Sequence, residues 1–367
     1  MLRWGGLGML AGLPGCGSPR PADLDTPEAA WPVPADYPQS FRTVGNRILD
    51  SNGRPRLFRG VAVPEVVWLA QRQDDQIGYF DRRLFRAAAE WGADILRLSL
   101  MPAVWRRHGD AAVLRVLDAA VAYARHHGQY LILCFHSIGF PPDGSYLALP
   151  DWFYGELLRT DGAEIYRCWQ VLARRYAREP AVAFYELLNE PARLLANGEA
   201  ATDDRPEHWL RWRDWCEGLI DGIRVHDARK PVLVGGLQFG YNLAWAAAAP
   251  VRRPNVVYAT HPYAGADWRF GWDEAWMQPA RQLPVMATEF GWDPQRHPEA
   301  QHKGPVPYRE AIFQAFDQAG IGWCALSFSH DFPPSLLAEP RHFTPSAYGE
   351  VVRAALRARA TPPGASA

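Results

Sequence analysis

Two glutamates in this sequence close short apolar runs of the kind that form buried strands. Glu190 follows the run at residues 182–188, and Glu289 ends the run at 284–289. A pair of carboxyl groups can perform glycoside hydrolysis: one carboxylate attacks the anomeric carbon, and the other, protonated, gives its proton to the leaving oxygen and then activates water. The two groups must hold opposite protonation states, which requires different surroundings. We therefore predict that Glu190 and Glu289 form a catalytic pair.

Four more polar side chains lie within or just after other apolar runs. Arg97 lies in the run at 94–100, His136 ends the run at 130–136, and His261 ends the run at 256–261, with Tyr263 just beyond. A buried charge without a partner is very costly, so Arg97 must pair with another group. That pair could be purely structural, and the two histidines could be satisfied core residues. Both alternatives stay open.

The elements that must position these residues alternate along the chain. The apolar runs are nearly continuous, as at 130–135, which is typical of parallel strands buried on both faces. Eight strand–helix units in about 300 residues predict an α/β protein with a single (β/α)8 TIM barrel, in which the C-terminal ends of the strands share one face. A doubly wound open sheet is the alternative, but the first strand lacks a Gly-rich phosphate turn. The expected strands span 57–63, 94–100, 130–136, 182–188, 231–235, 256–261, 284–289 and 321–327. The expected helices span 81–91, 111–127, 162–178, 208–226, 240–248, 272–281, 307–319 and 346–358.

A β-hairpin is predicted ahead of the barrel. Residues 47–50 and 57–59 are strand-like, and Asn52-Gly53 between them tolerates the positive φ angles of a tight turn. The hairpin opens the catalytic domain, which we expect over residues 39–358.

The two ends of the chain differ in composition from this body. Residues 1–16 hold one arginine, a short apolar segment and a small residue before Cys16, which resembles a bacterial lipoprotein signal. We expect an exported protein, periplasmic or at the cell surface, with a lipid anchor on Cys16; an ordinary secretory signal is the alternative. The Pro-rich residues 17–38 predict a linker, and residues 359–367 a disordered tail.

Composition narrows the classes of function. The chain has 367 residues, of which 48% are hydrophobic and 22% charged, and its net charge is −1. Such a chain is globular, and without a basic block or tail a nucleic-acid partner is disfavoured. No apolar run reaches the roughly 18–20 residues that span a bilayer. No phosphate loop, nicotinamide fingerprint or C-x-x-C pair occurs, so we expect no cofactor and no metal, and we expect a monomer. Whether Cys168 and Cys216 form a disulfide stays open.

Motifs in the same runs are similar to those of a known enzyme family. FYELLNEP at 184–191 and ATEFG at 287–291 resemble the signatures of glycoside hydrolase family 5, the cellulase-like family of clan A. Supporting matches are LRL at 96–98, HSIG at 136–139, HPY at 261–263 and FRGV at 58–61. The matches occur in the family's order and extend over residues 43 to 350.

The resemblance implies a retaining glycosidase that acts on a β-linked glycan, of the glucan or mannan type. It makes Glu190 the general acid/base and Glu289 the nucleophile. It also places the other polar residues: Asn189 on the sugar 2-hydroxyl, Arg97 and Tyr263 beside Glu289, and His136 and His261 along the site of the cleaved sugar, with His261 near Glu190.

The last strand departs from the family pattern. Leu326 stands where the family usually carries the tryptophan that forms the floor of the sugar site, and Cys134 stands where many members have an acid. Trp323 or Phe328 could supply a replacement ring, so both are predicted to bind substrate, and Trp68 is predicted to be a sugar platform. Further candidate platforms are Trp105, Phe140, Trp152, Tyr154, Trp268, Trp272, Trp292 and Phe332.

Other functions compete with hydrolysis. A glycan-binding protein with weak turnover would fit the change to Leu326. A transglycosylase shares the covalent intermediate. An esterase needs a nucleophilic serine with a histidine partner, and Ser137 beside His136 is the pair that suggests one.

Overall fold

The computed structural model describes residues 34–71, 80–146, 155–193, 201, 204–263, 271–292 and 308–360. The predicted signal segment, most of the predicted linker and the last seven residues of the predicted tail lie outside the described residues.

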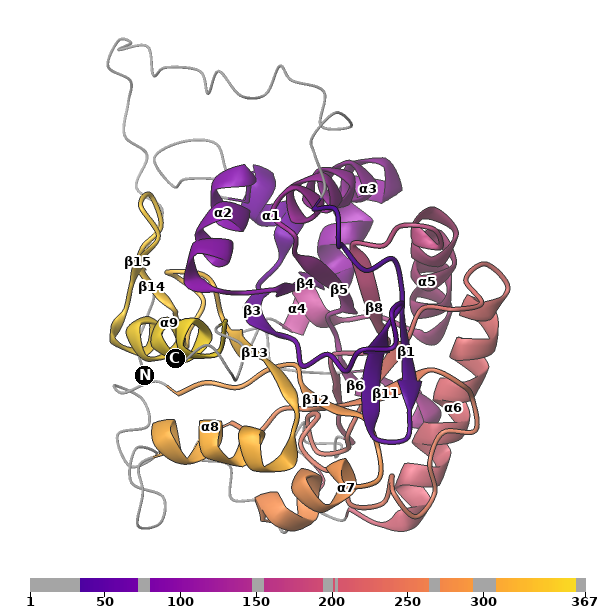
Figure 1. Ribbon diagram of the computed structural model, residues 1–367. Coiled ribbons are helices and arrows are strands. Elements are labelled where there is room, and N and C mark those ends of the chain that lie inside the picture. The colour runs from indigo at the N-terminus through magenta and orange to yellow at the C-terminus, as the bar shows by residue number, and fades with distance from the viewer. Residues whose placement is uncertain are drawn as a thin grey trace, which may run out of the picture.

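Eight parallel strands close into a barrel (Figure 1). Each strand pairs with the next barrel strand along the chain, and the last pairs with the first, so the predicted TIM barrel is confirmed and the open sheet is wrong. All eight strands fall within the predicted apolar runs, because these runs are buried on both faces. The barrel strands are β3 (Arg59–Val63), β4 (Ile95–Leu100), β5 (Tyr130–Phe135), β8 (Val182–Glu186), β10 (Val232–Gly235), β11 (Val256–Thr260), β12 (Val285–Ala287) and β13 (Gly322–Leu326).

Helices cover the outside of the barrel (Figure 1). Their apolar faces are buried while their polar faces stay exposed, as the helical spacing of apolar residues predicts. The longer helices are α2 (Arg82–Trp91), α3 (Pro102–His126), α5 (Gly162–Tyr176), α6 (Pro206–Arg224), α8 (Tyr308–Ala319) and α9 (Ala347–Ala360). The shorter ones are α1 (Val66–Gln71), α4 (Gly155–Leu158), η2 (Pro141–Asp143), and the pair η4 (Asp273–Met277) and α7 (Gln278–Ala280). None of the helices in the described part of the chain is both long and apolar enough to cross a membrane.

The predicted helix at 240–248 is wrong, because this segment forms a series of turns. The backbone enters it through residues with positive φ angles, Gln238, Phe239 and Gly240. The Asn242 side chain then accepts a hydrogen bond from the Ala244 backbone, a local contact that competes with helix formation.

The N-terminal hairpin is confirmed, but one of its strands is not the predicted one. β2 (Arg47–Asp50) pairs with β1 (Phe41–Val44), not with residues 57–59. The chain after β2 turns back because the Asp50 carboxylate accepts hydrogen bonds from the backbone amides of Asn52 and Arg54. Residues 57–59 then lead into the first barrel strand instead.

The hairpin closes the N-terminal end of the barrel. The Phe41 ring packs edge-on against Phe58 at 5.0 Å and Tyr130 at 4.8 Å between ring centroids. Tyr37 stacks on Tyr130 at 4.5 Å and donates a hydrogen bond to the Gln129 carbonyl, 2.6 Å away. The packed body therefore begins slightly before residue 39, the predicted boundary.

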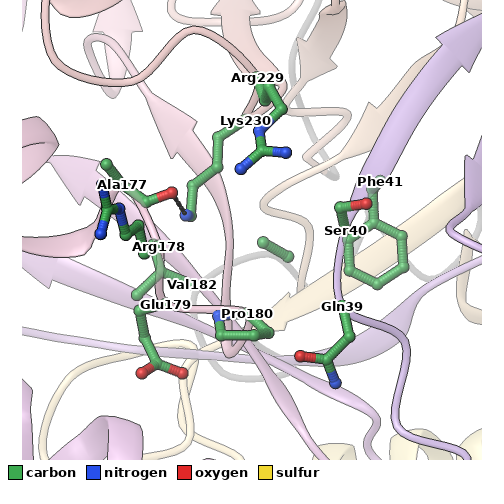
Figure 2. A pocket seen from close by; sticks show the side chains of 11 residues that line it. Gln39, Ser40, Phe41, Ala177, Arg178, Glu179, Pro180, Val182, Arg229 and Lys230 are labelled. Carbon is green, nitrogen blue, oxygen red and sulfur yellow. Dashed lines mark hydrogen bonds between the residues drawn. The ribbon is translucent and has the colours of Figure 1, made fainter.

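A pocket of about 330 Å³ lies at this same end, between the hairpin and the loops before β8 and β10 (Figure 2). The Lys230 amine donates hydrogen bonds to the carbonyls of Tyr176 and Ala177. Its charge is thus engaged in holding the loop that follows α5.

The four cysteines among the described residues are buried free thiols: Cys134, Cys168, Cys216 and Cys324. Cys168 and Cys216 therefore form no disulfide.

Candidate active site

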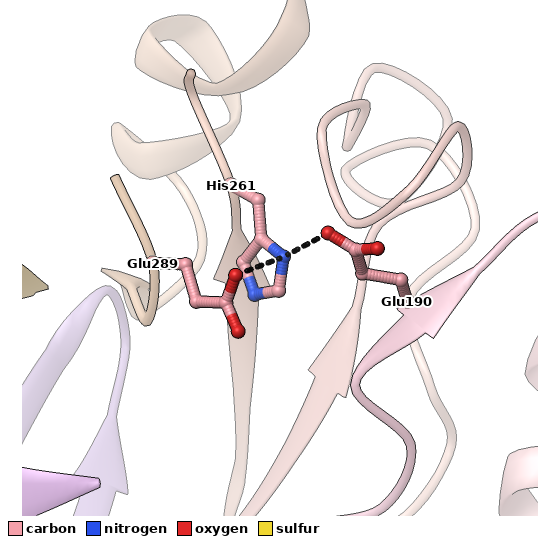
Figure 3. Close-up of side chains that lie close together, drawn as sticks. All are labelled: Glu190, His261 and Glu289. Carbon is pink, nitrogen blue, oxygen red and sulfur yellow. Dashed lines mark hydrogen bonds and ion pairs between the residues drawn. The ribbon is translucent and has the colours of Figure 1, made fainter. Parts of the chain in front are cut away.

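The barrel brings the predicted carboxyl pair to the C-terminal end of its strands (Figure 3). Glu190 lies four residues beyond the end of β8, in the short strand β9 (Glu190–Pro191), which pairs with β6 (Ile138–Phe140). The Glu190 amide donates a hydrogen bond to the Ser137 carbonyl at 3.2 Å. Glu289 follows β12 directly after Thr288. The pairing of β9 with β6 thus fixes the position of Glu190 after β8, and the closed barrel places Glu289 across from it.

His261 lies between the two carboxyl groups (Figure 3). Its Nδ1 is 3.1 Å from Glu190 Oε1 and 3.8 Å from Glu289 Oε2. One oxygen of Glu190 and one of Glu289 lie within 4.8 Å of each other. The Glu190 side chain is 14% exposed and that of Glu289 is 5% exposed, so Glu190 is the more accessible of the two.

Arg97 joins several of these residues through its guanidinium. It is fully buried on β4, and its Nη1 donates to Glu289 Oε1 at 2.5 Å. Its Nη2 donates to Asn189 Oδ1 at 2.7 Å, and its Nε to Glu186 Oε2 at 2.5 Å. Arg97 therefore pairs with two acids, one of which is the predicted nucleophile.

The surroundings drive the two carboxyl groups toward opposite protonation states. Burial raises the pKa of Glu190 above its usual range, and the charge on Glu289 adds to this effect, although the hydrogen bond from His261 opposes it. Burial also acts on Glu289, but the charges on Arg97 and His261 outweigh it and lower its pKa. The Tyr263 hydroxyl donates to Glu289 Oε2 at 2.8 Å and supports the ionised form.

The two histidines differ in charge. Burial opposes the charged form of His261, but attraction to Glu289, an ion pair with Glu186 at 3.8 Å and the hydrogen bond to Glu190 raise its pKa to about 9. Burial lowers the pKa of His136 to about 4, and its buried Nδ1 has no hydrogen-bond partner among the described residues. The surroundings therefore favour the protonated ring of His261 and the neutral ring of His136.

Two residues of this network were not singled out from the sequence. Glu186 ends β8 and is fully buried, and the Thr288 hydroxyl donates to its Oε1 at 2.7 Å. Thr288 Oγ1 also lies 3.0 Å from His261 Nε2. An acid inside an apolar run was the available signal, because a buried carboxylate needs a partner in the same way as Arg97 does.

The predicted replacement rings of the last strand do not face the site. Trp323 is fully buried against Phe290 and Phe313, with ring centroids 5.5 Å apart in each case. Phe313 belongs to α8, so Trp323 lies on the outer face of β13. Side chains alternate along a strand, which places Leu326 on the opposite, inner face. The prediction that Trp323 binds substrate is therefore wrong.

Phe328 is also a packing residue. It is fully buried, with its ring 5.0 Å from that of Trp91 in α2 and 5.9 Å from that of Phe343. Trp91 and Phe343 cover its ring, so the prediction that Phe328 binds substrate is wrong. Trp68 belongs to α1, and its side chain lies outside the described part of the structure.

The other candidate platforms divide into three groups. Trp105, Phe140 and Trp292 are buried, so little of their ring surface is exposed. Trp272 and Phe332 are partly buried against the core. Trp152, Tyr154 and Trp268 lie outside the described residues.

The pair that suggested an esterase is not assembled. The Ser137 hydroxyl donates to the Leu158 carbonyl at 2.6 Å rather than to His136. A nucleophilic serine needs its histidine within hydrogen-bond distance, so we discard this alternative.

The donor atoms of Glu190, His261 and Glu289 lie close enough together to surround a metal ion. Both ring nitrogens of His261 already have partners, Glu190 on one side and Thr288 on the other. In this arrangement the three groups contact one another, and Arg97, Tyr263 and Thr288 contact them from outside the cluster.

Comparison with known proteins gives one family. The model of the family "Cellulase (glycosyl hydrolase family 5)" matches residues 49–331. The chain is 26% identical over 320 residues to Endoglucanase E-5 of Thermobifida fusca, covering 84% of this chain and 59% of that protein. It is 23% identical to Endoglucanase N of Pectobacterium atrosepticum, covering 80% of this chain and 58% of that protein. The chain thus spans less than two thirds of the length of these relatives.

A solved structure is similar over a larger share of both chains. The β-glucanase SdGluc5_26A of Saccharophagus degradans, solved in complex with cellotetraose, is 30% identical with a TM-score of 0.75. The match covers 88% of this chain and 94% of that chain.

Proposed function

Because the chain belongs to the cellulase family, glycosyl hydrolase family 5, we propose that it is a retaining hydrolase of β-linked glycans. The observation that supports this most directly is the pair Glu190 and Glu289. One oxygen of each group lies within 4.8 Å of one oxygen of the other, and their surroundings shift their pKa values in opposite directions. Carboxyl groups in retaining enzymes are about 5–5.5 Å apart, whereas inverting enzymes need about 6.5–9.5 Å to admit a water.

In the first step, an oxygen of the Glu289 carboxylate forms a bond to the anomeric carbon. The bond between that carbon and the leaving oxygen breaks, and Glu190 gives its proton to this oxygen. The product is a sugar ester on Glu289 and an ionised Glu190. The lowered pKa of Glu289 and the raised pKa of Glu190 prepare both groups for these roles.

In the second step, water gives a proton to Glu190 while its oxygen attacks the anomeric carbon. The ester bond breaks, and Glu289 leaves as a carboxylate. Two displacements at the same carbon retain its configuration. Arg97 and Tyr263 favour this departure, because both donate hydrogen bonds to the carboxylate that is released.

Cellulose-type β-glucan is the substrate class that we propose. The support is the similar β-glucanase that was solved with cellotetraose. Asn189 is held by Arg97 beside the nucleophile, and we propose that its amide nitrogen donates to the sugar 2-hydroxyl. His136 lies nearby, and its buried Nδ1 has no hydrogen-bond partner among the residues that the structure describes, so it is proposed to line the same sugar site.

Turnover assays on cellotetraose, mixed-linkage β-glucan, mannan and xylan test the proposal. The variants Glu190→Gln and Glu289→Gln keep the size of each side chain and remove its acid–base or nucleophilic function. We expect each to lower kcat about 10²–10⁴-fold or more. Glu217→Gln is the matched control, because it removes a buried carboxylate of the outer helix α6, which is paired with Arg252 outside that helix. Wild-type turnover that survives in both site variants would contradict the assignment.

A glycan-binding protein with weak turnover is the second candidate. Leu326 favours it, because an aliphatic side chain occupies the inner face of β13 and neither Trp323 nor Phe328 replaces the ring. It predicts cello-oligosaccharide binding without hydrolysis, with affinity unchanged in Glu190→Gln and Glu289→Gln. A transglycosylase instead predicts longer products at high oligosaccharide concentration.

A further inference from the structure

Glu186 is a third carboxyl group beneath the catalytic pair, and the proposed mechanism gives it no role. It is fully buried at the end of β8, and its two oxygens have different partners. Oε2 accepts from Arg97 Nε at 2.5 Å, and Oε1 accepts from the Thr288 hydroxyl at 2.7 Å. Arg97 also contacts Glu289, Thr288 also contacts His261, and Glu186 Oε1 itself lies 3.8 Å from His261 Nε2.

The two links lead to different sides of the site. Arg97 connects Glu186 to the nucleophile, because its Nη1 donates to Glu289 Oε1. On the other side, the single proton of the Thr288 hydroxyl is directed to Glu186. The Thr288 oxygen is then free to accept a hydrogen bond from His261 Nε2, 3.0 Å away. His261 Nδ1 faces Glu190, so this arrangement favours a ring with a proton on each nitrogen.

Titratable groups surround Glu186 on several strands. These groups are Arg97 on β4, Cys134 on β5, His136 after β5, Glu190 after β8, His261 and Tyr263 after β11, Glu289 after β12 and Cys324 on β13. Burial raises the pKa of both thiols and of the Tyr263 phenol, and lowers that of His136, so these four are neutral near pH 7.

The remaining groups balance in the resting site. In the resting state of the proposed mechanism, Arg97 and His261 carry two positive charges, Glu186 and Glu289 carry two negative charges, and Glu190 holds its proton. In the first step the charge on Glu289 is lost to the ester bond, and Glu190 becomes a carboxylate. The sum is zero again, provided that Glu186 stays ionised throughout. Arg97 counters the effect of burial on Glu186 and lowers its pKa to about 2.

We propose that Glu186 is a positioning residue: it holds Arg97 and His261 in place and, as a fixed negative charge, keeps the buried site neutral through both steps. The proposal rests on the proposed function. Neutrality matters because an uncompensated charge in a buried site is costly. Without Glu186 this cost would apply both to the resting site and to the covalent intermediate.

The pH dependence of kcat/KM separates charge from shape. Glu186→Gln removes the negative charge and keeps the size. The loss of a negative charge makes every neighbouring proton easier to remove, so the pKa values of Glu289 and of the Glu190–His261 pair all fall. We expect both limbs of the profile to move to lower pH by about one unit. Glu186→Asp keeps the charge and shortens the side chain, so it should lower kcat and leave both limbs in place.

Glu217→Gln is the matched control again and should leave activity and both limbs unchanged. The proposal is overturned when Glu186→Gln lowers kcat with both limbs in their wild-type positions, which is the behaviour of a purely structural residue. It is equally overturned when Glu186→Asp moves the limbs as far as Glu186→Gln does.

A second measurement needs neither turnover nor a folded Glu186→Gln variant. In ¹⁵N NMR of the histidine-labelled wild-type protein, we expect His261 to keep protons on both ring nitrogens up to at least about pH 8, above the ordinary value of about 6.5. Thr288→Val breaks the link to Glu186 and should lower that titration point. A wild-type His261 that titrates near its ordinary pKa would refute the charge balance, even for a protein that hydrolyses no glycan.

Discussion

Replacement of Arg97 by methionine tests how strongly the site depends on one buried cation. The side chain is fully buried and makes charge-assisted hydrogen bonds of 2.5 Å to Glu186 and to Glu289. Removing one partner of a buried ion pair costs about 3–5 kcal/mol, because the remaining charge loses its compensation. Here two carboxylates lose it at once. We therefore expect Arg97→Met to lower the free energy of unfolding at pH 7 by at least about 3 kcal/mol.

The pH dependence of this loss gives a second check. Arg97 lowers the pKa values of both carboxyl groups in the folded protein, so its contribution is present above their ordinary pKa and lost as the pH falls toward their folded values. The difference between wild type and variant should therefore shrink from about pH 4.5 toward pH 2, the folded value for Glu186.

Urea unfolding followed by tryptophan fluorescence at pH 7 and pH 3.5 measures both effects. Arg175→Met is the control, because Arg175 pairs with Asp118 at 2.6 Å on the surface with 53% of its side chain exposed. Exposed pairs contribute about 0–1 kcal/mol. A loss in Arg97→Met no larger than in the control, or one that is equal at both pH values, would refute the reasoning.

Three further changes probe separate parts of the account. Tyr263→Phe removes a hydrogen bond to the Glu289 carboxylate, so the pKa of Glu289 rises; kcat should fall about tenfold and the acidic limb of the kcat/KM profile should move to higher pH. An unmoved acidic limb would contradict this contact. Gly240→Ala places a methyl group 2.8 Å from the His261 ring at a φ angle of +79°, so kcat should fall and the His261 NMR titration should change. Wild-type values for both would argue against this close approach. Trp323→Ala leaves a cavity behind β13 and should cost about 3–5 kcal/mol in urea unfolding with KM unchanged, whereas a large rise in KM would return Trp323 to the sugar site.

The barrel could be predicted because its strands are buried on both faces. Such strands read as continuous apolar runs, and all eight were found where the runs lie. The errors occur where specific contacts, and not the apolar pattern, determine the local structure. Residues 57–59 lead into the barrel, where Arg59 pairs with Trp323, and not into the hairpin; the alanine-rich segment at 240–248 forms turns with a local hydrogen bond to the Asn242 side chain.

The site could be predicted only in part. Residue types indicate where a strand ends, but they do not show which face of the strand each side chain occupies. Arg97, Glu190, His261 and Glu289 meet because each ends or lies within a buried run of one barrel. Trp323 was placed wrongly, since a shift of one residue along β13 moves a side chain from the inner to the outer face. Glu186 was overlooked although it lies within the quoted motif, because its partners come from strands far away in the sequence.

The anomeric configuration of the first product tests the central claim most directly. ¹H NMR can follow the hydrolysis of a soluble β-linked cello-oligosaccharide before the product mutarotates. Double displacement through Glu289 predicts that the β anomer appears first and that it disappears in Glu190→Gln and Glu289→Gln. An α anomer as the first product would show a single displacement by water and would contradict the mechanism drawn from these carboxyl groups.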